Sequence, residues 1–242
     1  MAKLAGEELR EIPYYGLMEC KVGGADCVIS QTGFTGEKGY EIYVRDAHAN
    51  AEKMWNAVLE AGEEFGLMVI APAHHRRIAA GILSWGQDLD HETSPFQVNL
   101  SYQVPRNKKS DYIGKEELER QRAIIDEGNA PFKMKMVGIT LGGKEITNYA
   151  PDFWLVTDTE DKEVGYVTSP WWSPELETNI ALAWVPWEAS EVGTKYKVKL
   201  PDEYSETPGV SVDAEIVDVP FRESVNPNKR EVQAAKGLDF AD

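Results

Sequence analysis

The 242-residue sequence has few of the residues that mark metal or disulfide chemistry. It holds two cysteines, Cys20 and Cys27, whose separation matches no zinc-binding or redox spacing, so we expect two free thiols. Of the four histidines, none forms the paired spacing that places two metal ligands on one helix face. The sequence therefore gives little support to metal-dependent catalysis.

Positive charge and long apolar runs are also scarce. The chain carries 25 Lys and Arg residues against 41 Asp and Glu residues, a formal net charge of −16 at pH 7. Such a surface repels phosphate backbones and anionic lipid, so we do not expect nucleic acid as a partner. No apolar run has the length of a membrane span, and residues 1–12 lack the apolar region of a secretory signal. We therefore expect a cytoplasmic protein without a membrane partner.

The first 130 residues alternate strand-like and helical patterns. Residues 27–44 predict a strand, a glycine-rich turn and a second strand. Asp46 is placed to cap a helix that ends near Gly62. Three further elements are expected, in this order: a strand over 66–70, a helix from Pro72 to about Ser84, and, within 111–128, a turn followed by a helix that ends at Gly128.

Beyond Pro131 the pattern changes to six short strand-like runs separated by turn residues. They cover residues 135–141, 153–158, 163–169, 179–185, 195–200 and 214–219. In the fifth run, Tyr196, Val198 and Leu200 alternate with three lysines, as in a strand with one buried face. Six strands without a helix predict a small antiparallel barrel or sandwich. We therefore expect three parts: residues 1–130, residues 131–221 and a polar, extended or loosely ordered tail over 222–242.

Four segments carry a resemblance to a known family. They are SQTGFTGEKGYEI at 30–42, RRIAAGILSWGQDLD at 76–90, SPFQVNL with DYIGKEEL between 94 and 118, and VGYVTSPWWSPELETNIALAWVP at 164–186. In this order, over residues 16 to about 222, they resemble the glycine-cleavage T-protein (aminomethyltransferase) superfamily, which includes dimethylsulfoniopropionate demethylase-like members. The chain lacks a counterpart of that family's N-terminal third.

The resemblance implies an α+β fold, with an incomplete folate-binding α/β body followed by a C-terminal antiparallel β-barrel. It also implies a transferase that moves a methyl or aminomethyl unit from a small methylated or aminomethyl donor onto tetrahydrofolate. Four positions depart from the family pattern: Gln31, Ala73, His74 and Ala79. These departures make a glycine-cleavage substrate doubtful. The segments IAPAHHRRI at 70–78, GILSWGQDLD at 81–90 and SPFQV at 94–98 resemble the demethylase-type branch more closely.

The resemblance further implies five cofactor-binding residues: Glu37, Tyr40, Arg77, Trp85 and Trp172. Glu37 matches the glutamate that binds the pterin, and Arg77 matches a second folate contact, for which Arg76 competes. A charged hydrogen bond of this kind contributes roughly 1.5–3 kcal/mol. Each residue also has a structural reading, such as a solvated turn glutamate, a helical salt bridge on the surface or an aromatic that packs in the core.

The catalytic residue cannot be assigned from this sequence. The family's catalytic aspartate lies in the N-terminal third, and nothing in residues 1–16 matches its surroundings. The chain is therefore a fragment, or a second chain supplies the missing N-terminal part, or the protein binds folate without turnover. A non-catalytic folate-binding module and a subunit-interface fragment stay open as alternatives. The iron–sulfur-related branch is disfavoured because its turn carries a cysteine and this one does not. The leading hypothesis requires Glu37 and Arg77 to converge on opposite ends of the cofactor.

Overall fold

The computed structural model describes residues 1–72, 74–106, 108–148, 150 and 152–221. The described residues fall into two compact units that divide between Ala73 and His74. We call residues 1–72 unit 1 and the described residues from 74 to 221 unit 2. Residues 74–130 thus group with the barrel, whereas the boundary near residue 130 stays a prediction of the sequence. The predicted tail over 222–242 lies outside the described residues.

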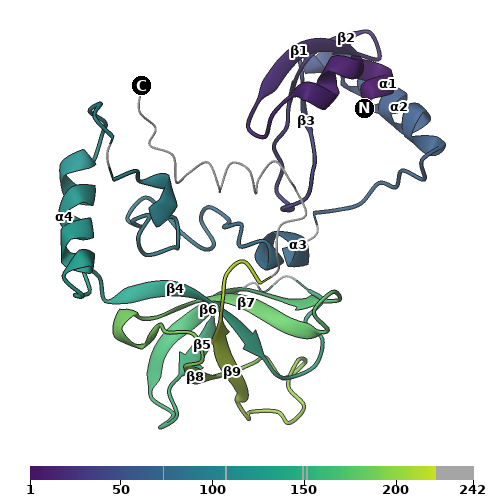
Figure 1. Cartoon of the computed structure of the whole chain (residues 1–242). Helices are drawn as coiled ribbons and strands as arrows, with labels where there is room; N and C mark the ends of the chain where they lie inside the picture. Colours follow the sequence, from purple (N-terminus) through teal and green to yellow (C-terminus); the bar gives the residue numbers. More distant parts are fainter. Residues whose placement is uncertain (73, 107, 149, 151, 222–242) are drawn as a thin grey trace. The chain divides into compact units, whose positions relative to one another are not determined.

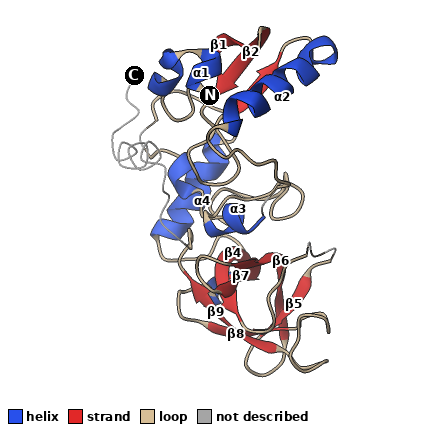
Figure 2. Cartoon of the chain, turned by 90° about the vertical axis from the view of Figure 1, so that its right-hand side faces the viewer, coloured by secondary structure: helices blue, strands red, loops and turns tan. Residues whose placement is uncertain are grey.

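Unit 1 is a three-stranded antiparallel sheet in the order β1-β2-β3, with helices against it (Figures 1 and 2). Its elements are α1 (Ala2–Ala5), η1 (Glu7–Glu11), β1 (Leu17–Val22), β2 (Ala25–Ser30), β3 (Glu41–Val44) and α2 (Ala47–Glu63). Gly23 and Gly24 connect β1 to β2 with φ angles of 59° and 81°. Two consecutive positive φ angles are what a two-residue hairpin turn needs, and glycine adopts them without steric cost.

The core of unit 1 lies on the inward face of this sheet. Val22, Cys27 and Ile29 are almost fully buried there, and Met54 and Val58 of α2 pack against them. Cys20 and Cys27 are both free thiols, as predicted.

Two sequence predictions for unit 1 need correction. The helix after Asp46 forms, but it runs through Gly62, and the turn that ends it is made by Gly66 with φ 69°. The Leu67 N–H donates to the Gly62 carbonyl across this turn at 3.1 Å. The predicted strand over 66–70 is wrong: this apolar segment is not in a strand, because no described strand edge pairs with it.

Unit 2 contains a closed antiparallel barrel with the strand order β4-β7-β6-β5-β8-β9 (Figure 1). Its strands are β4 (Met134–Leu141), β5 (Trp154–Thr157), β6 (Glu163–Ser173), β7 (Thr178–Pro186), β8 (Lys195–Val198) and β9 (Val212–Val217). Its helices are α3 (His74–Ala79), η2 (Ser101–Gln103), α4 (Lys115–Asp126) and η3 (Trp187–Ala189). All six predicted strands form, and the α+β class with a barrel is confirmed.

Barrel side chains are buried both inside the barrel and on part of its outer surface. Tyr196, Val198 and Leu200 point into its interior, as their alternation predicts. Strand β7 is buried on both faces, because Ile180 and its alternate neighbours pack outside the barrel against α3. Figure 1 shows α3 lying over β6 and β7, so the helix packs against the outer face of these two strands.

Both predicted helices of unit 2 form, the first in a shorter version and the second as expected after a turn. Helix α3 ends at Ala79, well before Ser84, because Gly81 adopts φ 68° and the Ile82 N–H returns to the Arg77 carbonyl at 2.8 Å. Helix α4 begins at Lys115 and ends before Gly128, the expected terminator, which has φ 81°. No helix among the described residues combines the length and apolar character that crossing a membrane requires.

Candidate functional site

The connection from β2 to β3 in unit 1 carries the predicted pterin-binding glutamate. Ser30 pairs with Glu41 in the antiparallel register, so the ten residues 31–40 form the connecting turn. Glu37 is half-buried in this turn, and its N–H donates to Thr35 Oγ1 at 3.3 Å. The turn is also held at its base, where the Thr32 hydroxyl donates to the Glu41 carboxylate.

Tyr40 lies at the end of the same turn. It is half-buried and packs against the core of unit 1. This position agrees with the packing role that the sequence left open, while a contact with a cofactor stays a prediction. The structure therefore brings Glu37 and Tyr40 together on one short turn.

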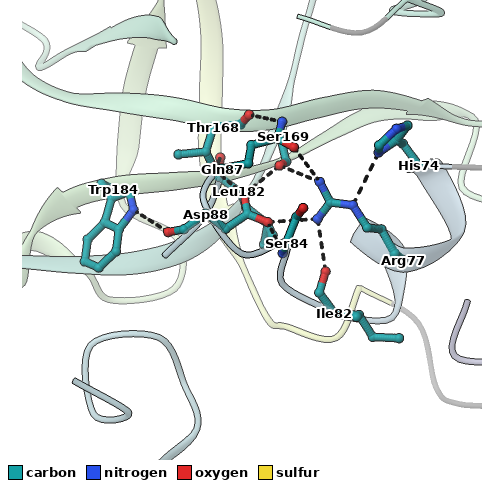
Figure 3. Close-up of polar contacts among 10 residues, drawn as sticks. All are labelled: His74, Arg77, Ile82, Ser84, Gln87, Asp88, Thr168, Ser169, Leu182 and Trp184. Atoms are coloured by element: carbon teal, nitrogen blue, oxygen red, sulfur yellow. Dashed lines mark hydrogen bonds and ion pairs between the residues drawn. The ribbon is translucent and has the colours of Figure 1, made fainter. Parts of the chain in front are cut away.

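Unit 2 contains a buried ion pair between Arg77 of α3 and Asp88 (Figure 3). Arg77 Nη1 lies 2.8 Å from Asp88 Oδ2, and the two side chains are 1% and 0% exposed. The remaining four N–H groups of the guanidinium donate to Ile82 O at 3.1 Å, Ser169 Oγ at 2.8 Å, Gln87 Oε1 at 3.3 Å and His74 Nδ1 at 3.4 Å. All five donors of Arg77 are thus used within the protein.

Asp88 is equally well paired. Its Oδ1 accepts hydrogen bonds from the Thr168 and Ser169 hydroxyls, both at 2.6 Å. Its Oδ2 accepts from the Ser84 N–H at 2.7 Å in addition to Arg77. A carboxylate has about four lone-pair sites, so this one is saturated. The network fastens α3 and the turn after it onto β6.

His74 joins this network from the start of α3. Its ring lies 5.3 Å from the Trp171 ring between centroids. Burial lowers the pKa of His74 below its ordinary value, and the positive charge of Arg77 lowers it further, while Asp88 acts in the opposite direction. The neutral ring is also the form that can accept the Arg77 Nε–H at Nδ1.

The role predicted for Arg77 changes in this light. The structural alternative weighed from the sequence, an exposed helical salt bridge, is wrong, since Arg77 pairs with a buried residue outside its helix. Its neighbour Arg76 is the exposed one. The geometry shows that Arg77 anchors α3 to the barrel. Contact of Arg77 with a cofactor, and its convergence with Glu37 on that cofactor, stay predictions.

The two predicted tryptophans have different surroundings in unit 2. Trp85 is 69% exposed on the turn that also carries Asp88, so most of its indole lies outside the core. Trp172 is half-buried near the end of β6, and its backbone N–H donates to the Ile146 carbonyl at 2.8 Å. Their cofactor contacts stay predictions.

Asp88, Thr168 and Ser169 were missed in the sequence. Asp88 and Ser169 lie 11 and 92 positions from Arg77. A separation of 11 fits a helix period, but α3 ends at Ala79, and Ser169 lies far away in the sequence, so no local pattern marks these contacts. Within the ranges that the structure covers, no group of three or more His, Cys, Asp or Glu residues is arranged to hold a metal ion.

Two family models match this chain. Residues 1–108 match the GCVT N-terminal domain, and residues 134–222 match the glycine cleavage T-protein C-terminal barrel domain. The second match covers the barrel that the structure shows in unit 2.

Similarity to curated proteins agrees with these two family models. The chain is 31% identical over 224 residues to an aminomethyltransferase of Geobacillus sp. (strain WCH70), covering 91% of this chain and 56% of that protein. It is 33% identical over 222 residues to an aminomethyltransferase of Listeria welshimeri, covering 91% and 56%. The chain thus spans about half the length of the curated relatives it matches.

A solved structure shares the fold. The crystal structure of glycine cleavage system aminomethyltransferase T from Bartonella henselae matches with a TM-score of 0.67. The match covers 89% of this chain and 54% of that one, at 22% sequence identity.

Proposed function

Because the chain belongs to the glycine-cleavage T-protein family, we propose that it binds tetrahydrofolate and takes part in transfer of a one-carbon unit to it. The observation that carries this proposal is the turn over residues 31–40. It holds a half-buried carboxylate, Glu37, on a glycine-rich connection with an aromatic residue, Tyr40, at its end. A carboxylate complements the aminopyrimidine edge of a pterin, because that edge presents adjacent N–H donors.

The network around Arg77 supports this function indirectly. In our proposal, it fixes α3 and the turn over residues 84–88 on the barrel, so that Trp85 is presented on a rigid support. A binding residue works best when its own backbone is held by packing and hydrogen bonds. Trp85 and Trp172 are the proposed apolar walls for the cofactor.

The one-carbon donor is proposed to be a small methylated or aminomethyl compound. The name shared by the curated relatives favours an aminomethyl donor. The departures at Ala73, His74 and Ala79 weaken the case for a glycine-cleavage substrate, and the resemblance of residues 70–78 to the demethylase-type branch favours a methylated donor. A transfer assay with each donor class, read as the form of folate produced, distinguishes the two.

Calorimetric titration of the full chain with tetrahydrofolate tests the proposed function. We expect saturable binding that Glu37→Gln weakens roughly 10- to 150-fold, the loss of a charged hydrogen bond of 1.5–3 kcal/mol. Glu52→Gln, the same chemical change on the exposed face of α2, is the matched control and leaves the affinity unchanged. Absence of binding by the unmodified chain contradicts the proposal, and equal binding by the Glu37→Gln variant removes the assignment of this residue.

A non-catalytic folate-binding module is the second candidate, favoured by one observation. The chain spans about half the length of its relatives. In this case the protein binds tetrahydrofolate with the same dependence on Glu37 but yields no product with either donor.

A further inference from the structure

Gln31 has a buried side chain whose polar atoms make no hydrogen bond. Both Nε2 and Oε1 lack a partner among the described residues, and the residue is 0% exposed. Its backbone, by contrast, is paired: the N–H donates to Gly16 O at 3.0 Å, and the carbonyl accepts from the Tyr15 N–H at 3.2 Å. Buried polar groups nearly always have a partner, because leaving them unpaired costs their full desolvation. The carboxamide therefore points to a group that binds beside it.

The position of Gln31 links it to the candidate site of unit 1. It follows the alternating buried residues of β2, so its side chain is on the inward face of the sheet. The β2–β3 register pairs Ile29 with Ile42, and continuing it by two residues sets Gln31 opposite Tyr40. Gln31 is itself the first residue of the turn that carries Glu37. Gln31, Tyr40 and the Glu37 turn thus occupy one end of the sheet.

A carboxamide offers an N–H donor beside a carbonyl acceptor. A tetrahydropterin presents the complementary pair along one edge, because the oxygen on carbon 4 accepts and the N–H at ring position 5 donates. The edge with the amino group is the one proposed for Glu37, so the two protein groups do not compete.

We propose that Gln31 binds this second edge, with Nε2 donating to the ring oxygen and Oε1 accepting from the N5–H. The inference rests on the proposed folate binding. In dihydrofolate and folic acid N5 carries no hydrogen, so Oε1 would face a lone pair. Reversing the carboxamide would set Oε1 against the ring oxygen instead. Gln31 is therefore a specificity residue that selects the tetrahydro state of the cofactor.

Because the Gln31 side chain is fully buried, access to it requires neighbouring residues, such as those of the turn, to move. The turn contains three glycines, Gly33, Gly36 and Gly39. Gly36 has φ 75°, and the space where a side chain would stand at Gly33 has no atom within 4 Å. Because glycine restricts the backbone least, these positions allow the turn to change its conformation.

The test compares tetrahydrofolate with dihydrofolate as ligands of the full chain and of its Gln31→Leu variant. We expect the unmodified chain to bind tetrahydrofolate about tenfold or more tightly than dihydrofolate. Gln31→Leu loses this preference and binds both forms within about twofold to threefold, at an unchanged or higher melting temperature, because no unpaired polar group is left. Thr157→Val is the matched control: it removes the other buried unpaired side-chain atom of the described residues, far along the chain in β5, and keeps the preference.

Every outcome of this test either supports or overturns the inference about Gln31. A preference that persists in Gln31→Leu, or an unmodified chain that binds both ligands equally, overturns the inference and leaves the proposed function standing. A variant that changes only in melting temperature shows that Gln31 is paired by an internal water or another polypeptide, and also overturns it. Binding of neither ligand by the unmodified chain overturns both. If Gln31→Leu does not fold, Gln31→Met, which keeps the length and flexibility of the side chain, is measured in its place.

Discussion

At the scale of single residues, the buried ion pair between Arg77 and Asp88 is the interaction whose loss we expect to destabilise the fold most. Asp88→Asn keeps the size of the side chain but leaves the Arg77 charge buried without its counter-ion. Breaking one partner of a buried pair costs about 3–5 kcal/mol, so we expect that loss in the free energy of unfolding, measured by urea denaturation.

Two comparisons make this prediction specific. Glu117→Gln removes one partner of an exposed ion pair with Arg120 on α4 and is expected to change the unfolding midpoint only slightly. The double replacement of Arg77 by Met and Asp88 by Leu is expected to recover part of the stability lost in Asp88→Asn, because no charge is then buried. An Asp88→Asn variant as stable as the unmodified chain contradicts the assigned role.

His74 gives a pH-dependent prediction at the same scale. Its pKa in the folded chain is lowered from the ordinary value of 6.5, first by burial and then by Arg77. The folded state therefore prefers the neutral ring, so the stability that this residue contributes is present above pH 6.5 and is lost as the pH falls below it. Protonation at Nδ1 also removes the acceptor of the Arg77 Nε–H.

The measurement is the melting temperature between pH 8 and pH 5. We expect the unmodified chain to lose more stability across this range than His74→Gln, which has no titrating group at the position. His91→Gln, an exposed position in unit 2, is expected to keep the full pH dependence. Equal curves for the unmodified chain and His74→Gln would show that the ring is not held in its neutral form.

Single residues could be predicted where their role depends on neighbouring positions in the sequence, but not where it depends on contacts with distant parts of the chain. The turn with Glu37 and Tyr40 is a local pattern, and the structure places both residues on it. Arg77 was selected for its position in a motif, but its surroundings come from Ser169, 92 positions away, and from Asp88 in an irregular turn. No periodicity marks such contacts. The missing partners of Gln31 are likewise visible only once its burial is known.

At the scale of elements, alternation predicted the barrel well, because each strand has one face inside it. Strand β8 shows this most clearly, with Tyr196 and Val198 buried. The same reasoning failed for residues 66–70, where an apolar run has no neighbouring strand. Helix α3 is shorter than its pattern predicts because the turn at Gly81 interrupts it. A run of apolar residues indicates that a segment tends to be buried. Whether the segment forms a strand or a helix depends on which other elements are available to pack or pair with it.

The ends of the two predicted helices of unit 2 provide a matched pair of variants. Gly81 and Gly128 have φ angles of 68° and 81°, which strain any other residue. A Cβ at Gly81 would also lie 2.6 Å from Val219 Cγ1, whereas nothing lies within 4 Å of one at Gly128. We expect Gly128→Ala to cost about 1 kcal/mol of unfolding free energy and Gly81→Ala clearly more, as measured by urea denaturation. Equal losses would mean that Val219 moves aside without cost.

At the scale of the whole molecule, the pairing of a sheet unit with a barrel unit agrees with the family assignment, since the two family models match in the same order along the chain. The barrel closes on itself and uses every strand edge, so it is complete within this chain. The sheet of unit 1 has only three strands, and its outer strands β1 and β3 each have one unpaired edge among the described residues. Open edges readily accept further strands.

This difference leads to a prediction about catalysis. The relatives are about twice as long as the matched region, so we expect a polypeptide corresponding to their remaining part to complete the active site. The chain alone is then expected to bind tetrahydrofolate with a dependence on Glu37 but to form no detectable one-carbon product. Adding the complementary polypeptide, taken from the Geobacillus relative, is expected to restore product formation with a methylated or aminomethyl donor. The matched control is the same mixture made with Glu37→Gln, which should bind the polypeptide but lose activity at subsaturating tetrahydrofolate. Product formation by the chain alone would show that its own residues suffice, and a complex without product would favour the non-catalytic module.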